Sequence, residues 1–195
     1  MARYCLLGHV DPAKLDVYKA RHAAVWPELL VALSKVEALS GFRPLEDALT
    51  ELRALADALA DGPGKDALLA CASLCSGSSQ TARAAVLEWA LAPNSPARHA
   101  VPAIGNALAE GIPGISELRL RALRRLCEEY PNDPGVLVSL LLHVVELEPG
   151  QAIYLPSGQL HAYLHGLAIE VMASSDNVLR GGLTVKHIDT TELAR

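Results

Sequence analysis

The stretch "GQAIYLPSGQLHAYLH", residues 150–165, sets the fold that we expect for the last third of the chain. Its spaced residues follow the pattern G-x5-P-x-G-x2-H, from Gly150 through Pro156 and Gly158 to His161. Proline and glycine at this spacing predict a turn between two strands. His161 then begins the second strand, where its imidazole can point inward and offer a ring nitrogen to a metal.

The strand that follows the turn alternates between two faces. Period-two alternation places three ring-bearing residues, His161, Tyr163 and His165, on the same face. The two histidines stand four residues apart, so an extended strand separates them by about 13 Å. We therefore do not expect these two histidines to bind one ion together.

The spaced pattern is similar to the second sequence motif of the cupin superfamily, whose members are small jelly-roll barrels. The last position of that motif is usually Asn and is His165 here. A lone histidine beside a turn is usually an ordinary polar residue. Because all four spaced positions match, the resemblance favours a metal-binding role for His161.

The composition indicates an ordinary globular chain. It has 195 residues, of which 51% are hydrophobic and only 4% aromatic, so Leu, Val, Ala and Ile must form the core. The net charge of −5 argues against nucleic acid or acidic membranes as partners. No apolar run reaches the roughly 18 residues of a membrane helix, and the N-terminus lacks a secretory pattern. We expect a cytoplasmic protein without nucleic-acid or membrane partners.

The four cysteines, Cys5, Cys71, Cys75 and Cys127, lack the paired spacing of a C-x-x-C metal site. Cys71 and Cys75 stand four apart in a helical stretch, which would allow them to bind a metal together. Two small buried thiols are the preferred interpretation, because free cysteine commonly behaves as a small buried hydrophobe.

The chain begins with a predicted strand–helix unit. "RYCLLGHV" (3–10) is a short apolar run typical of a strand. The next stretch, 12–33, is expected to be a helix that Pro27 bends or interrupts. Its helical spacing rests on three residues: Leu15, Tyr18 and His22.

The middle of the chain is predicted to be helical and its end to be rich in strands. Leucines recur at steps of three and four from 45 to 59, and Gly, Pro, Ser or Asn separates the helices that follow. Further helices are expected near 65–74, 79–91, 97–110 and 115–129. The stretch 136–142 fits either a short helix or a buried strand. The expected class is α+β, with a strand–helix segment (1–34), a helical region (35–132) and part of a jelly roll (133–195).

Ordered motifs on both sides of the helical region resemble type I mannose-6-phosphate isomerase. They are "GFRP" (41–44), "YPNDPGV" (130–136), "LEPGQAIYLPSG" (147–158), "LHAYLHG" (160–166) and "EVMASSDNVLRGGLTVKHID" (170–189). The resemblance covers about residues 28–195. It implies zinc-dependent interconversion of mannose 6-phosphate and fructose 6-phosphate, with a sugar phosphate as the partner.

The resemblance also implies zinc ligands. In that family, zinc is held by the Gln and His of a Q-x-H segment, the Glu of H-K-P-E and the His of H-A-Y-L. The last two match Glu28 and His161, although "VW" stands where His-Lys is expected. Glu28 keeps the family register, thirteen positions before Gly41 (41 − 28). No Q-x-H precedes Glu28, so we expect weak zinc binding through two ligands.

Three further residues match catalytic positions of the family: Glu170, Arg180 and Lys186, with Val185 in place of the usual Pro. Moving a proton between C1 and C2 of a sugar needs a base, a Lewis acid and cations for the phosphate. A glutamate suits the base, and Arg180 with Lys186 suits the phosphate. Without the resemblance, these would be ordinary surface residues.

A second resemblance covers residues 3 to about 33. "YKARHAAVWPELLVAL" (18–33), behind the strand "CLLGHV", is similar to L-rhamnose mutarotase. The Y-x3-H segment of that family matches Tyr18 and His22, which share one helix face and can exchange protons with an anomeric hydroxyl. A surface pair is the alternative. Mutarotation and non-catalytic sugar binding are therefore the rival functions.

The jelly roll is expected to be incomplete. The barrel strands that precede Glu28 in the isomerase family have no counterpart, and the chain stops at "TTELAR" where the family continues. Unpaired strand edges invite association. We therefore expect self-association or marginal stability of residues 136–185, and doubtful activity.

Overall fold

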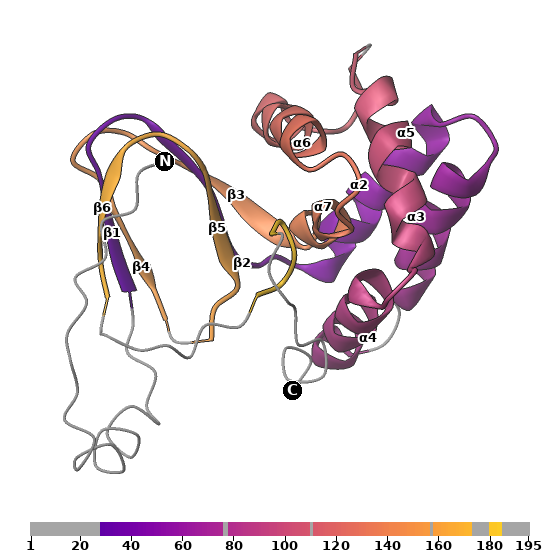
Figure 1. Cartoon of the computed structure of the whole chain (residues 1–195), viewed down its shortest axis with the longest axis horizontal. Helices are drawn as coiled ribbons and strands as arrows, with labels where there is room; N and C mark the ends of the chain where they lie inside the picture. The colour runs from indigo at the N-terminus through magenta and orange to yellow at the C-terminus, as the bar shows by residue number, and fades with distance from the viewer. Residues whose placement is uncertain (1–27, 76–77, 110, 157, 173–179, 185–195) are drawn as a thin grey trace. The chain divides into compact units, whose positions relative to one another are not determined.

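The computed structural model describes residues 28–75, 78–109, 111–156, 158–172 and 180–184, which fall into two compact units (Figure 1). One unit comprises Met1–Ser40 with Val145–Val178, and the other comprises Gly41–Val144 with Leu179–Arg195. Each unit thus joins stretches that are far apart in the sequence. The mixture of helices and antiparallel strands confirms the α+β class. The division at 34 and 132 remains a prediction.

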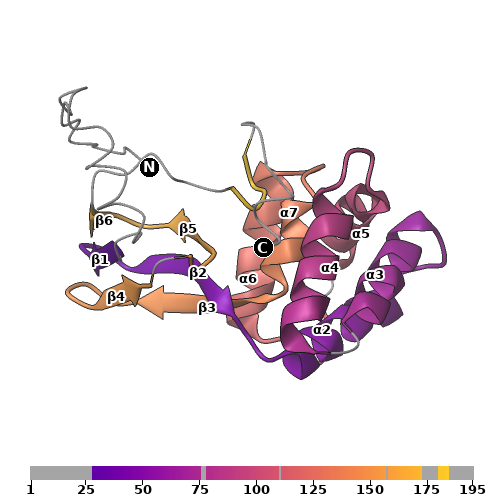
Figure 2. The ribbon, with the colours of Figure 1, turned by 90° about the horizontal axis from the view of Figure 1, so that it is seen from below.

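The first unit is built around two three-stranded sheets. In one, β1 (Glu28–Ala32) lies between β4 (Ala152–Leu155) and β6 (Ala168–Val171). In the other, β2 (Val36–Phe42) lies between β3 (Leu142–Leu147) and β5 (His161–His165). Figure 2 shows both central strands flanked in this way. β1 pairs antiparallel with both of its neighbours.

The helix predicted through residues 28–33 is wrong for the part that the structure describes. Residues 28–32 form β1, in which Leu30 and Ala32 are buried while Leu29 lies exposed. This period-two burial is that of a strand with one face on a core. Pairing on both sides of β1 overrides the helical spacing seen in the sequence. The predicted strand at 3–10 and the helix from 12 to 27 lie outside the described residues.

The two faces of the β4-β1-β6 sheet differ in what they contact. Leu30, Ala32, Val36 and Leu147 form a buried cluster against one face. On the other face, exposed apolar side chains stand opposite one another across the strands. Leu29 is opposite Tyr154 and Val171, and the half-buried Val31 is opposite Ile169. The sheet therefore has a second apolar face without cover from the described residues.

The second unit contains the predicted helices. They are α2 (Leu45–Ala58), α3 (Pro63–Leu74), α4 (Ser79–Leu91), η2 (Pro96–His99), α5 (Ala100–Ala107), α6 (Glu117–Glu129) and α7 (Gly135–Ser139). The predicted helices at 65–74, 79–91 and 115–129 are confirmed to within two residues, and the one at 97–110 divides into η2 and α5. The ambiguous stretch 136–142 is mostly helical, with β3 beginning at Leu142.

Leucine and alanine dominate the core of the helical unit, as the composition predicted. The fully buried large side chains in it include Leu52, Leu55, Leu68, Leu123 and Leu126. The thiols of Cys71, Cys75 and Cys127 are free and buried, which agrees with the preferred interpretation of the cysteines. No helix among the described residues is both long enough and apolar enough to span a membrane.

A buried charge network joins the helices to the chain that precedes β3. The Glu51 carboxylate of α2 forms ion pairs with Arg43 (2.6 Å) and with Arg119 of α6 (3.2 Å), both through Oε2. The side chains of the two arginines are only 8% and 5% exposed. One carboxylate therefore compensates two buried cations, which would otherwise be costly to remove from water.

The same arginines satisfy backbone carbonyl groups at the end of α7. Arg43 donates from Nε to the Leu140 oxygen (2.9 Å), while Arg119 donates to the oxygens of Ser139 (3.0 Å) and Leu142 (2.6 Å). Burial lowers the pKa of Arg119 to about 10, and the Glu51 carboxylate opposes this shift. The guanidinium thus stays charged at neutral pH and holds the helix-to-strand junction.

We expect Glu51→Gln to destabilise the protein by about 3–5 kcal/mol, because it leaves two buried guanidinium groups without their carboxylate. The measurement is the free energy of unfolding in urea. Asp57→Asn, an exposed change on the same helix, is the control and should stay within about 0.5 kcal/mol of the parent. Equal stabilities for the two variants would contradict this role of the network.

Candidate metal site

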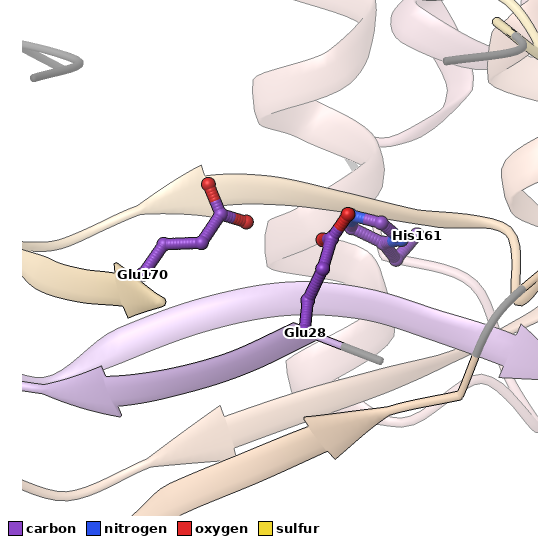
Figure 3. Close-up of side chains that lie close together, drawn as sticks. All are labelled: Glu28, His161 and Glu170. Atoms are coloured by element: carbon purple, nitrogen blue, oxygen red, sulfur yellow. The ribbon is translucent and has the colours of Figure 1, made fainter. Parts of the chain in front are cut away.

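Three side chains from three strands of the first unit lie close together: Glu28 of β1, His161 of β5 and Glu170 of β6 (Figure 3). Each offers one ligand atom, and these atoms lie within 4.8 Å of one another. Two strands belong to one sheet and the third to the other. The group therefore joins the two sheets.

Strand pairing places both carboxylates on the same face of one sheet. Glu170 lies directly opposite Leu30, and Glu28 stands two residues before Leu30 on β1. Residues two apart on a strand, and residues opposite each other on paired strands, share a face. Since Leu30 belongs to the buried cluster of this unit, both glutamates are on the face that bears the core.

Hydrogen bonding determines which nitrogen His161 presents. Its Nδ1 lies 2.9 Å from the backbone oxygen of Gln159. A carbonyl oxygen only accepts, so Nδ1 carries the hydrogen and a neutral ring keeps its lone pair on Nε2. Nε2 faces the Glu28 carboxylate at 3.2 Å. The Gln159 side chain in turn donates to the Ser40 hydroxyl at 2.7 Å.

Glu170 is held from the opposite sheet. The Tyr163 hydroxyl donates to its Oε1 at 2.5 Å. Tyr163 is two residues beyond His161 on β5, and the two rings are 5.4 Å apart. Its ring packs against the buried cluster that contains Leu30. Strand β5 therefore contributes both the imidazole and the hydroxyl that holds Glu170.

The donor set suits zinc. Imidazole nitrogens and carboxylate oxygens are both zinc ligand atoms, and three protein ligands leave one position for water in a catalytic site. With bonds of about 2.1 Å, tetrahedral ligand atoms lie about 3.4 Å apart. The 3.2 Å between His161 Nε2 and Glu28 Oε2 is close to that spacing. The side chains of these two residues are only 26% and 21% exposed.

Of the remaining predicted site residues, Arg180 alone lies among those that the structure describes. His165 is exposed, and the β2–β5 pairing is irregular between its partner Glu37 and Ala38. Arg180 belongs to the second unit. Lys186 and the mutarotase pair, Tyr18 and His22, lie outside the described residues.

The sequence analysis did not identify Glu170 as a candidate ligand. Its resemblance-based role was catalytic, and only Glu28 and His161 were counted as ligands. The signal that was missing is the register of β1 against β6, which puts Glu170 opposite Leu30. No spacing along the chain reveals that register, because Glu28 and Glu170 are far apart in sequence.

The turn between β5 and β6 depends on Gly166, which has φ of +108°. A Cβ at this position would meet the backbone oxygen of Lys35 and lie 2.8 Å from the Cα of Val36. The turn before β5 has Gly158 at φ +74° with open space around it, as the predicted turn requires. Both turns adjoin β5, but only at Gly166 would a Cβ collide with neighbouring atoms.

Comparison with known proteins gives two different matches. A family model described as L-rhamnose mutarotase matches residues 3–40. Mannose-6-phosphate isomerase 1 of Arabidopsis thaliana is 31% identical over 172 residues, covering 86% of this chain and 40% of the relative. The mannose-6-phosphate isomerase of Aspergillus fumigatus is 34% identical over 195 residues, covering 86% of this chain and 42% of the relative.

Solved structures agree with the second match. Mannose 6-phosphate isomerase from Salmonella typhimurium, bound to its substrate f6p and a zinc atom, has a TM-score of 0.69 and 34% sequence identity. The match covers 87% of this chain and 40% of that chain. This chain thus spans about 40% of the length of these relatives. The likeness supports the jelly-roll expectation, since it extends over most of the chain.

We expect Gly166→Ala to lower the free energy of unfolding by more than Gly158→Ala does. Positive φ alone costs a residue with a Cβ about 1–2 kcal/mol, and the closed surroundings of Gly166 add about 1–3 kcal/mol of overpacking. Urea unfolding of both variants measures the difference. A smaller loss of unfolding free energy for Gly166→Ala than for Gly158→Ala would show that the β5–β6 turn can shift to make room for a Cβ.

Proposed function

Most of this chain is homologous to mannose-6-phosphate isomerases, and on this premise we propose that it binds zinc and interconverts mannose 6-phosphate and fructose 6-phosphate. The observation that supports this best is the pairing of Glu28 with His161. The two residues that match family zinc ligands are 133 positions apart (161 − 28), yet their side chains lie 3.2 Å apart.

Glu28 and His161 would hold the metal through Oε2 and Nε2. A bound zinc ion supplies Lewis acidity, which polarises the oxygens of the sugar. His161 can offer its Nε2 lone pair to the metal, because its Nδ1–H donates a hydrogen bond to the backbone oxygen of Gln159. The hydrogen bond from Gln159 to Ser40 ties this arrangement to β2. Such outer contacts fix the orientation of a ligating imidazole.

The remaining roles follow from the resemblance and from residue chemistry. The Glu170 carboxylate is the candidate for accepting the proton that moves between C1 and C2. Arg180 and Lys186 are the candidates for the phosphate, because a guanidinium can donate two parallel hydrogen bonds to it and an ammonium adds a point charge.

We expect the purified chain to convert fructose 6-phosphate in a zinc-dependent manner. His161→Ala should lose most of this activity because it removes a ligand, and Arg180→Ala should lose most of it because it removes the forked donor. The control is His165→Ala, which should keep the parental rate. The assay follows mannose 6-phosphate formation while zinc is titrated.

Three results would contradict this proposal. Turnover that does not depend on zinc would show that the metal has no role in the reaction. Equal rates for Arg180→Ala and the parent would show that Arg180 has none. Metal-free exchange of sugar anomers, without isomerisation, would instead favour the mutarotase-like segment at 3–40.

We also propose that the chain self-associates through the exposed face of the β4-β1-β6 sheet. Ile169, Val171 and Tyr154 on this face are 52%, 59% and 60% exposed. Apolar surface of this kind on a sheet is a common association site. Among the described strands, β4 and β6 each pair with one neighbour. A second copy presents the same apolar face and is therefore self-complementary.

We expect Ile169→Lys to shift the chain toward monomer, because it places a charge on this apolar face. Sedimentation velocity at several concentrations measures the shift. Leu69→Lys, at a 46% exposed position of α3, is the control and should keep the parental distribution. A parent that is monomeric at every concentration would end this proposal.

A further inference from the structure

We infer that Glu170 is a third protein ligand of the zinc site and that Tyr163 is the residue that positions it. The inference rests on the proposed site at Glu28 and His161, and it changes the expected coordination from two protein ligands to three. Its consequence is tighter zinc binding than the two matched ligands alone would give.

The position of Glu170 supports a ligand role. Its strand, β6, pairs directly with β1, and its register places it opposite Leu30 on the face that also bears Glu28. In Figure 3 its carboxylate points toward Glu28 and His161. A ligand atom from each of the three residues lies within 4.8 Å of the other two. Small side-chain rotations can therefore bring all three onto one ion.

The hydrogen bond from Tyr163 leaves Glu170 able to bind a metal. Tyr163 donates to Oε1, whereas an ionised carboxylate has two oxygens with about four acceptor sites. Oε2 and the second lone pair of Oε1 thus remain for a cation. Hydrogen bonds of this kind orient ligating carboxylates in metal sites.

Tyr163 is itself well placed to act as a rigid support. It lies on the same strand as His161, and its ring packs against the buried cluster of Leu30, Ala32, Val36 and Leu147. A hydroxyl on a packed ring restricts the carboxylate it contacts more than a mobile surface donor would. Strand β5 therefore sets the positions of two ligands, one directly and one through Tyr163.

Coordination chemistry separates this inference from a role in proton transfer alone. Two protein ligands leave a zinc ion largely hydrated, whereas a catalytic site normally has three protein ligands and one open position. If Glu170 only transferred protons, its carboxylate would act on the ion through its charge alone and would leave the number of ligands unchanged. The decisive quantities are therefore zinc affinity and ligand number, both measured without any substrate.

The experiment measures zinc affinity of the full chain by competition with a chromophoric chelator. We expect Glu170→Gln to weaken binding on the order of 100-fold, since losing a ligand should cost at least as much as the 10–100-fold typical of outer contacts. Tyr163→Phe should weaken it about 10-fold, at the lower end of that range. Circular dichroism establishes that each variant is folded.

Two matched controls come from the same unit. Glu148→Gln removes an exposed carboxylate that lies 3.7 Å from Lys35, and Tyr154→Phe removes the hydroxyl of a tyrosine that is 60% exposed. Both should bind zinc as the parent does. Cobalt(II) titration supplies a second readout, because its absorption spectrum reports the number of ligands and should change in Glu170→Gln.

The outcomes separate this inference from the proposed function. If Glu28→Ala and His161→Ala weaken zinc binding but Glu170→Gln does not, the third ligand is refuted and the two-ligand site stands. If neither of the first two changes affects zinc, the proposed site fails and the inference fails with it. If Glu170→Gln weakens binding and Tyr163→Phe does not, the positioning role of Tyr163 is overturned.

Discussion

The pairing of β1 with both β4 and β6 is the constraint on which the site depends. It places Glu28 and Glu170 on the face that bears the core and leaves Leu29 on the opposite face. It also shows which segments of the chain residues 28–32 pair with. These residues fall within the 3–40 match to the mutarotase model, yet they pair with strands that carry the isomerase-like motifs.

The helical unit depends on a different interaction, the sharing of one carboxylate by two buried guanidinium groups. Burial of Arg119 is unfavourable by itself, as the lowering of its pKa to about 10 shows. Glu51 offsets that cost by pairing the charge, and the carbonyl oxygens of Ser139 and Leu142 offset it by accepting hydrogen bonds from the guanidinium. These contacts hold in place the junction between α7 and β3.

The candidate metal site illustrates how a chain that spans about 40% of its relatives can still present a three-donor arrangement. Two of its donors match family ligands by sequence, and the third comes from a strand whose position follows from sheet pairing. The hydrogen bonds of His161 and Glu170 are made within the same unit.

Local patterns in the sequence were sufficient to predict most of the helices and the turn at Gly158, and they identified His161 as a candidate ligand. Leucine spacing and the Gly, Pro and Ser breaks depend on neighbours a few residues away, so α2, α3, α4 and α6 were predicted closely. Glu28 was also identified, through its interval to Gly41. Only the tertiary structure decided that residues 28–32 form a strand and that Glu170 lies beside Glu28. The physical reason is that strand register arises from pairing between distant segments, and a shift of one residue would turn every side chain to the other face.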